Sequence, residues 1–198
     1  KLCKTDQTLY RRGNFMGTWD QVLVNSLREE HDADFAMSAG VRWGTSVPAG
    51  HDVTMEDLMT NTSMTYGETY VSELKGAQLK DILEGIAENL FVQDPYLQSG
   101  GDMVRMGGMD YTIDPAATLG NRISEMKDDE GTTIDPNKSY KVSGWAQVGS
   151  VGNGRLMWDV AADYLRKQGT LDLKKVNHPT IKGVKTNPGI ENYAGKLI

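Results

Sequence analysis

The chain has 198 residues, 38% of them hydrophobic and 24% charged, which is an ordinary composition for a globular protein. Its formal net charge of -6 argues against nucleic acid as a partner. No apolar run approaches the roughly 20 residues that a membrane-spanning helix needs, so we also expect no membrane segment.

The ends of the chain and its cysteine and histidine residues limit the chemistry expected of it. It begins at Lys1 instead of a methionine, so we expect a fragment of a longer protein, and the missing signal peptide then says nothing about compartment. Cys3 is its one cysteine, and the histidines have no metal-ligand spacing. We therefore expect no metal site and no cofactor in this chain.

Helix signals occur at four places. One helix is expected to begin at Thr18, which lies at capping-box distance from Gln21, and a short one at Thr54. The clearest amphipathic pattern runs from Leu79 to Leu90, and we expect its leucines and isoleucines in the core. The expected helices are 18–30, 54–59, 79–90 and 156–169.

Strand signals alternate with these helices. The expected strands are 34–38, 64–74, 103–113, 121–126, 132–134 and 140–145. We expect an interruption near Gly67, a turn at Lys75-Gly76 and a bulge at Gly107-Gly108. Because helices and strands are intermixed, the sequence predicts an α+β fold, a single domain with a mixed sheet and flanking helices.

The outer segments of the chain are polar or rich in glycine and proline. We expect an entry segment or linker over residues 1–14, one domain over residues 15–176, and an irregular tail over residues 177–198.

Residues 38–44, Ser-Ala-Gly-Val-Arg-Trp-Gly, follow an apolar strand and contain one arginine beside one tryptophan between two glycines. Glycine lets backbone approach a ligand, and a guanidinium offers a rigid fork of donors for an oxyanion. From these residues alone, a solvated Arg42 and a Trp43 that caps the core are the favoured interpretation. An anion site is the alternative.

Two further loops contain unusual residues, at 64–69 and 144–154. If they meet the first loop, one cleft contains Arg42, Trp43, Tyr66, Trp145 and Asn153. Such a cleft suits a small anion, or a planar group stacked between rings. Core packing is an equal alternative for Tyr66 and Trp145, and a turn role is favoured for Asn153.

Arg105 lies within an apolar strand. Pairing with Asp102 or another acid is favoured for it over contact with a ligand or partner. The chain contains no nucleophile with an evident base.

The order of these motifs resembles the C-terminal domain of the 5'-nucleotidase family. The matching segments are 34–44, 54–58, 66–69, 73–80 and 144–154. Within that family the match is similar to the SoxB-type thiosulfohydrolases of bacterial sulfur oxidation. The segments most similar to that branch are 9–15, 41–45, 66–70 and 100–111. The resemblance covers residues 9 to 168.

This resemblance implies a larger enzyme. A missing N-terminal metallophosphatase domain would hold two manganese ions, and this chain would supply substrate-binding residues. In the SoxB-type reaction a metal-activated water releases sulfate from a cysteine S-thiosulfonate. The resemblance implies that the substrate is held on the swinging arm of a SoxYZ-like carrier protein, and that the protein is periplasmic.

The resemblance also implies roles for single residues. Arg42 matches an arginine that contacts substrate, and Tyr66 and Trp145 fall near the two aromatic residues that stack the base in nucleotidases. Asn153 matches an aspartate that holds the ribose, and an amide there weakens the case for a sugar. Either Arg11 or Arg12 matches another substrate arginine. The resemblance gives Arg105 no clear role.

Three functions are compatible with the sequence. The leading hypothesis is the substrate-recognition domain of a SoxB-like thiosulfohydrolase, inactive as the isolated chain. The alternative is the C-terminal domain of a 5'-nucleotidase or related phosphoesterase. A second alternative is a binding module without turnover of its own.

Overall fold

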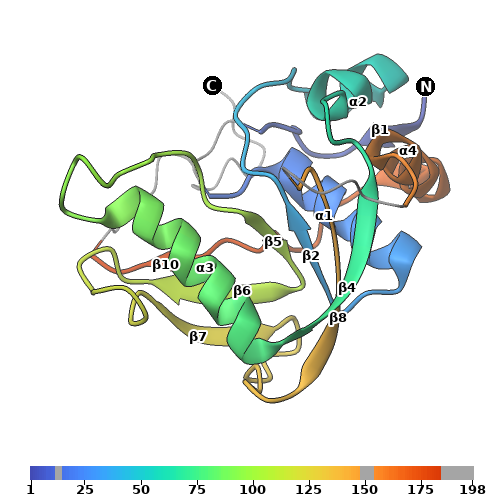
Figure 1. Cartoon of the computed structure of the whole chain (residues 1–198). Coiled ribbons are helices and arrows are strands. Elements are labelled where there is room, and N and C mark those ends of the chain that lie inside the picture. The colour runs from blue at the N-terminus through green and yellow to red at the C-terminus, as the bar shows by residue number, and fades with distance from the viewer. Residues whose placement is uncertain (12–14, 148–153, 184–198) are drawn as a thin grey trace.

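A four-stranded mixed sheet lies at the centre of the computed structural model, which describes residues 1–11, 15–147 and 154–183 (Figure 1). Its strand order is β4-β8-β2-β5. The strands are β2 (Phe35–Ser38), β4 (Thr69–Lys75), β5 (Arg105–Gly107) and β8 (Ser139–Trp145). Strands β2 and β8 run parallel, whereas β4 and β5 run antiparallel to their neighbours.

The register of this sheet brings four chain segments to one edge. Met37 lies opposite Gly144, Thr69 opposite Trp145, and Ser38 opposite Arg105. The carboxyl ends of β2 and β8 therefore meet the amino ends of β4 and β5. Loops that leave this edge can share one site although they are far apart in sequence.

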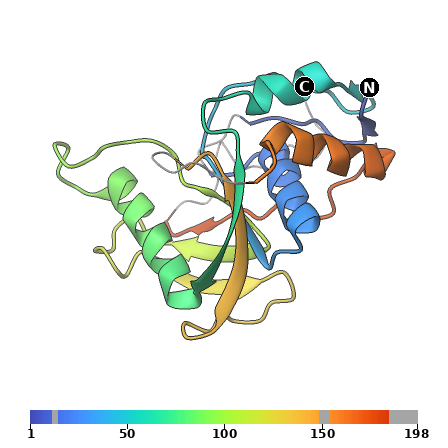
Figure 2. The same ribbon diagram turned by 45° about the vertical axis from the view of Figure 1, so that its right-hand side comes forward.

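Two hydrophobic cores lie on the two faces of the central sheet. Helices α1 (Thr18–His31) and α4 (Met157–Gln168) pack together on one side, and α3 (Gly76–Phe91) covers the other, as Figure 2 shows. The first core contains Trp19, Leu23 and Leu27 of α1, which recur at helical spacing. The second contains Leu79 and Leu83 of α3 together with Met106 of β5.

Two smaller sheets and one short helix complete the fold. Strands β1 (Cys3–Thr5), β3 (Asp52–Val53) and β9 (Thr170–Leu171) form one sheet in the order β3-β1-β9. Strands β6 (Met109–Ile113), β7 (Ile123–Asp128) and β10 (Thr180–Ile181) form the other in the order β10-β6-β7. Helix α2 (Met55–Thr62) follows β3.

The predicted α+β fold with flanking helices is confirmed, and each of the three sheets mixes parallel and antiparallel pairs. None of the described helices is long and apolar enough to cross a membrane.

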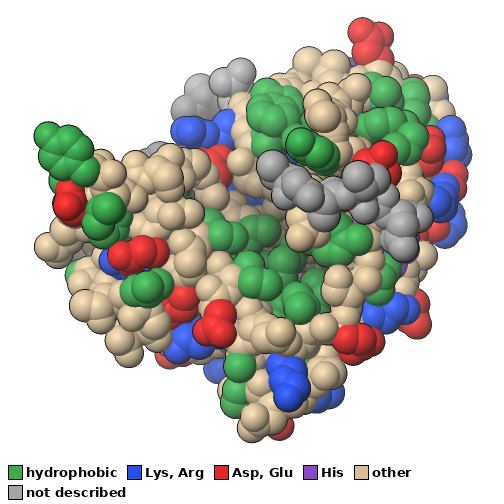
Figure 3. All heavy atoms as spheres, viewed as in Figure 1, with side chains coloured by type: hydrophobic (Ala, Val, Ile, Leu, Met, Phe, Trp, Pro, Cys, Tyr) green, Lys and Arg blue, Asp and Glu red, His purple; other side chains and the backbone are tan. Residues whose placement is uncertain are grey.

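Hydrophobic side chains gather in a hollow in the middle of the face shown in Figure 3. The expected domain limits at residues 14 and 176 stay predictions.

The starts of two helices differ in part from the predictions. Helix α1 begins at Thr18 as predicted, but its cap is Gly17, whose backbone N–H donates to Asp20 at 2.8 Å, so the predicted capping box of Thr18 and Gln21 was wrong. The Thr18 hydroxyl instead donates to the carbonyl of Thr8. The predicted turn at Lys75-Gly76 was also wrong, because α3 begins at Gly76 directly after β4. The capping box of Thr54 and Asp57 at α2 is confirmed.

The segment predicted as one strand over 103–113 is two strands in two sheets. Gly108 separates β5 from β6, and its φ of 82° lies in the left-handed region that glycine adopts without strain. Strand β5 then pairs with β2, and β6 pairs with β7. The glycine pair therefore redirects the chain between sheets instead of forming a bulge within one strand.

Candidate functional site

The loop that follows β2 begins at the shared edge of the sheet, and its two glycines permit close contacts. A Cβ on Gly40 would lie 2.5 Å from the backbone oxygen of Met103. Gly44 has a φ of 102°, and a Cβ there would lie 2.2 Å from Oδ1 of Asn61. A larger residue at either position would move the loop away from the chain segments that hold it.

Polar contacts hold this loop at both ends. Arg11 Nη2 donates to the carbonyl of Ala39 at 3.1 Å, and Arg11 Nη1 donates to the carbonyl of Asn61. The Asn61 side chain donates through Nδ2 to the carbonyl of Thr45 at 3.3 Å. Arg42 therefore projects from a loop whose backbone is fixed on either side.

Buried charges lie beneath the same loop. The carboxylate of Asp20 contacts Arg11 Nε at 2.9 Å and Arg105 Nε at 3.3 Å. Asp102 Oδ2 in turn lies 3.3 Å from both Arg105 Nη2 and Arg42 Nε. We call these five residues, Arg11, Asp20, Arg105, Asp102 and Arg42, the charge array. Its charges alternate in sign, and one positive charge is in excess.

The buried end of the charge array depends on its ion pairs. Burial raises the pKa of the Asp20 carboxyl, and the contacts with Arg11 and Arg105 oppose that rise. Burial likewise lowers the pKa of Arg11, against the effect of Asp20. Removal of one partner from such a buried pair costs about 3–5 kcal/mol, because an uncompensated charge remains.

Arg42 forms the exposed end of the charge array. Its side chain is 60% exposed. Together with Trp43, Gly101 and Asp102 it lines a cavity of about 380 Å³. A neighbouring cavity of about 190 Å³ adds Phe15, Leu90 and Phe91 as apolar walls. A guanidinium next to apolar and aromatic walls suits an oxyanion that carries a thin organic arm.

The predicted aromatic residues differ in access. Trp43 is 47% exposed and Tyr66 is 38% exposed. Trp145 is only 3% exposed, and its Nε1 donates to Ser38 Oγ at 2.8 Å. Trp145 thus joins the ends of β8 and β2 and offers no free ring face to a ligand.

Two predicted site residues, Arg12 and Asn153, lie outside the described residues. The side chains of Arg11 and Arg105 are buried, so they cannot contact a ligand in the cavity directly. They act on it only through their ion pairs in the charge array. The favoured interpretation of Arg105, pairing with Asp102 or another acid, is confirmed. Sequence reasoning missed Asp20 and Asn61, because each lies within a helix and nothing local marks its distant partner.

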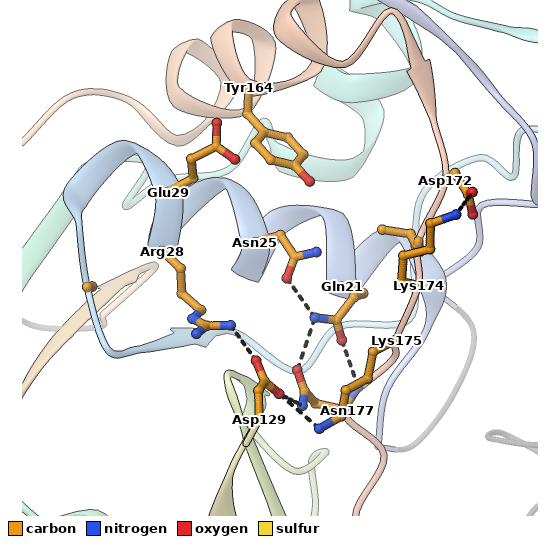
Figure 4. A pocket seen from close by; sticks show the side chains of 12 residues that line it. Gln21, Asn25, Arg28, Glu29, Asp129, Tyr164, Asp172, Lys174, Lys175 and Asn177 are labelled. Atoms are coloured by element: carbon orange, nitrogen blue, oxygen red, sulfur yellow. Dashed lines mark hydrogen bonds and ion pairs between the residues drawn. The ribbon is translucent and has the colours of Figure 1, made fainter. Parts of the chain in front are cut away.

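A second polar cavity of about 470 Å³ lies between α1, α4 and residues 172–177 (Figure 4). Its arginine and lysine side chains are each paired with an aspartate. Arg28 Nη1 lies 2.7 Å from Asp129, and Lys175 Nζ lies 2.9 Å from the same carboxylate. Asn177 bonds both Gln21 and Asp129. These contacts attach the segment around Asn177 to α1.

The part of the chain that the structure describes contains no three histidine, cysteine, aspartate or glutamate residues close enough together to hold a metal ion. Asp20 and Asp102, the two aspartates of the charge array, form ion pairs with arginines.

Comparison with known families finds one match. The model of the 5'-nucleotidase C-terminal domain matches residues 6–160. Among curated proteins, none matches this sequence significantly.

Comparison with solved structures finds similar folds. Sulfate thiohydrolase SoxB of Thermus thermophilus, in complex with glycerol, has a TM-score of 0.86 and 32% identity over 96% of this chain and 36% of that one. A 5'-nucleotidase precursor, also of Thermus thermophilus, has a TM-score of 0.70 and 15% identity over 92% of this chain and 39% of that one.

The NAD nucleotidase of Haemophilus influenzae has a TM-score of 0.69 and 16% identity over 91% of this chain and 38% of that one. Both nucleotidases share the fold with this chain. In all three cases the chain spans less than two fifths of the solved protein.

Proposed function

We propose that this chain, which belongs to the 5'-nucleotidase C-terminal domain family, is the substrate-recognition domain of a SoxB-like thiosulfohydrolase. The similarity to a SoxB structure at 32% identity supports this branch of the family. The observation that carries the proposal is Arg42, a mostly exposed guanidinium above buried counter-charges at the rim of a cavity with aromatic walls.

In this proposal Arg42 binds the sulfonate end of a cysteine S-thiosulfonate. Two parallel N–H groups of a guanidinium match two oxygens of a sulfonate, as they do for carboxylate and phosphate. Trp43, which lines the cavity next to Arg42, contacts the arm that presents the substrate. Arg11 and Arg105 hold the loop of Arg42 from beneath, and Trp145 fixes the strand end before it.

The reaction is a hydrolysis. Water adds to the sulfonate sulfur, the bond from that sulfur to the next sulfur breaks, and the persulfide sulfur left on the carrier takes up the proton while sulfate leaves. Two manganese ions in an upstream metallophosphatase domain would activate the water and stabilise the leaving group. We propose that domain and a SoxYZ-like carrier as partners, and the periplasm as the location.

A 5'-nucleotidase or related phosphoesterase is the alternative function. The resemblance implies that nucleotidases of this family stack the base between two aromatic residues. Trp145 is buried, and residues 146–154 contain no aromatic side chain. Of that expected pair, Tyr66 has an exposed ring and Trp145 does not, which supports a small oxyanion over a base stacked between these two residues.

A binding module without turnover is the second alternative. We propose that it describes the isolated chain, because the proposal assigns the chemistry to the upstream domain. In the proposed enzyme, this chain binds and orients the substrate while the upstream domain performs the chemistry.

The test uses this chain joined to the proposed upstream domain and loaded with manganese. Sulfate release is followed from a carrier peptide with a cysteine S-thiosulfonate, in parallel with phosphate release from AMP. We expect sulfate and no phosphate. Phosphate from AMP without sulfate from the peptide would contradict the proposal and assign the chain to the nucleotidases.

A further inference from the structure

Asp102 occupies an unusual place for an acid beside an anion site. Its carboxylate is buried, yet it lines the cavity next to Arg42. An acid in that position repels an anionic ligand, so on charge alone it weakens binding. A site that binds an oxyanion therefore needs a reason to retain this carboxylate.

The contacts of Asp102 suggest that reason. Asp102 Oδ2 lies 3.3 Å from Arg42 Nε. The same oxygen lies 3.3 Å from Arg105 Nη2, and Arg105 is held in turn by Asp20. A guanidinium is planar and rigid, so fixing Nε fixes the direction of both terminal nitrogens.

We propose that Asp102 is a positioning residue, which sets the direction of the Arg42 guanidinium so that its two terminal nitrogens face the cavity. This inference deepens the proposed function and rests on it for the choice of oxyanion. Arg105 and Asp20 act one step further away, because they hold Asp102 in place. Gly40 permits this arrangement, since a Cβ there would lie 2.8 Å from the Asp102 Cβ.

The proposal makes a prediction opposite in sign to simple electrostatics. The D102N variant removes a negative charge from the site, so charge alone predicts tighter binding of an oxyanion. If Asp102 positions Arg42, the variant binds more weakly, because the ion pair at Nε is lost and the guanidinium is no longer held in one direction. We expect the half-saturating sulfate concentration to rise about tenfold in D102N.

The measurement is a titration of the chain with sulfate, and separately with phosphate, at an ionic strength held constant with sodium chloride. Binding is followed by NMR at the backbone amides of Trp43 and Gly101. The matched control is E130Q, which removes one negative charge at the exposed turn after β7. We expect E130Q to bind as the unmodified chain does.

A double-mutant cycle separates positioning from general damage to the fold. Lysine lacks the guanidinium Nε that pairs with Asp102, so R42K weakens binding and R42K/D102N weakens it by less than about twofold more. If D102N weakens binding equally in the unmodified chain and in the R42K variant, the proposal is overturned. Unchanged or tighter binding in D102N would overturn it as well. If R42K no longer binds sulfate, the comparison of D102N with E130Q decides.

Near-ultraviolet circular dichroism shows whether D102N folds. If it does not fold, a measurement on the unmodified chain without ligand tests the proposal instead. In the unmodified chain the ion pair with Asp102 keeps the Arg42 side chain close to that carboxylate. We expect a nuclear Overhauser effect between the Arg42 Hδ and Asp102 Hβ protons. Its absence in the folded, unmodified chain would overturn the positioning role.

These readouts distinguish this inference from the proposed function. Should the longer protein release phosphate from AMP and no sulfate, the thiosulfohydrolase function fails, but weaker phosphate binding by D102N would still support positioning. Unweakened binding of both anions by D102N overturns the inference whatever the enzyme hydrolyses.

Discussion

Trp145 illustrates how one side chain can suggest a ligand site and instead serve the scaffold. Its type and its position after a strand match a stacking residue. In the structure its indole N–H donates a hydrogen bond to Oγ of Ser38, the last residue of β2, and its ring is buried. The bond joins the two strand ends that precede the candidate site.

The W145F variant tests this structural role. Phenylalanine keeps an aromatic ring and removes the Nε1–H that donates to Ser38. We expect the free energy of unfolding in urea to fall by about 1–3 kcal/mol, because the Ser38 hydroxyl stays buried without that donor. S38A is the matched variant, and the two losses should not add. Additive losses would show that the bond does not exist in solution.

Cys3 gives a second prediction for a single residue. Burial, with a smaller effect of Asp52, raises the pKa of its thiol to about 11. Since the thiolate is the reactive species, we expect Cys3 to react with Ellman's reagent at pH 8 far more slowly in the folded chain than in 6 M guanidinium. Equal rates in both conditions would contradict the burial of the Cys3 side chain.

Helix α1 and strand β5 approach closely enough that glycine is required between them. A Cβ on Gly107 would lie 2.6 Å from the Val24 Cβ of α1. We expect G107A to lower the free energy of unfolding by about 1–3 kcal/mol, because the helix must shift away from the sheet.

The matched control for G107A is G85A on helix α3. Space around Gly85 is open, and alanine favours a helix interior over glycine by about 1 kcal/mol. We therefore expect G85A to be more stable than the unmodified chain in the same urea titration. Destabilisation by G85A, or none by G107A, would contradict the packing described here.

At the level of elements, local patterns predict much of the fold. The helical spacing of Leu79 and Leu83 and the capping box of Thr54 are properties of neighbouring residues, and the structure has helices at both. The assignment of strands to sheets is not local. Alternation over residues 103–113 is the same whether the chain stays in one sheet or moves to another at Gly108.

The candidate site was predictable only in part for the same reason. Arg42 stands out because of its own neighbours, and the register of β2, β4 and β8 explains why the predicted loops share an edge. The partners of Arg105 come from α1 and from the loop before β5. Such pairs depend on tertiary contacts, which no spacing along the chain encodes.

On the scale of the whole molecule, the segment after β9 is attached through Asn177, next to a partly buried histidine, His178. Burial lowers the pKa of His178, and burial also lowers that of His31. The unfolded chain therefore binds protons at a higher pH than the folded one, near 6.5 for a free histidine. We expect the free energy of unfolding to fall as the pH decreases from 7 to 5.

The H178Q variant tests how much His178 contributes to the pH dependence of the free energy of unfolding. Glutamine does not titrate, so the decrease between pH 7 and pH 5 should be smaller in H178Q than in the unmodified chain. The H51Q variant, at an exposed histidine, is the control and should keep the full slope. An unchanged slope in H178Q would contradict the burial of this residue.

The isolated chain should be a binding domain without turnover. With manganese added, we expect no release of sulfate from the S-thiosulfonate peptide and none of phosphate from AMP. Detectable hydrolysis by residues 1–198, at a rate that scales with the chain concentration, would contradict the assignment of the chemistry to an upstream domain.

The account depends most on Arg42, and the most direct measurement is kcat/KM for sulfate release by the R42A variant of the longer enzyme. We expect a loss of about 100-fold, with an unchanged circular dichroism spectrum, because a charge-assisted contact with the substrate is removed. R166A, at an exposed arginine of α4 that pairs with Asp163, is the control and should keep full activity. An unchanged kcat/KM in R42A would contradict the central claim and remove Arg42 from the substrate site.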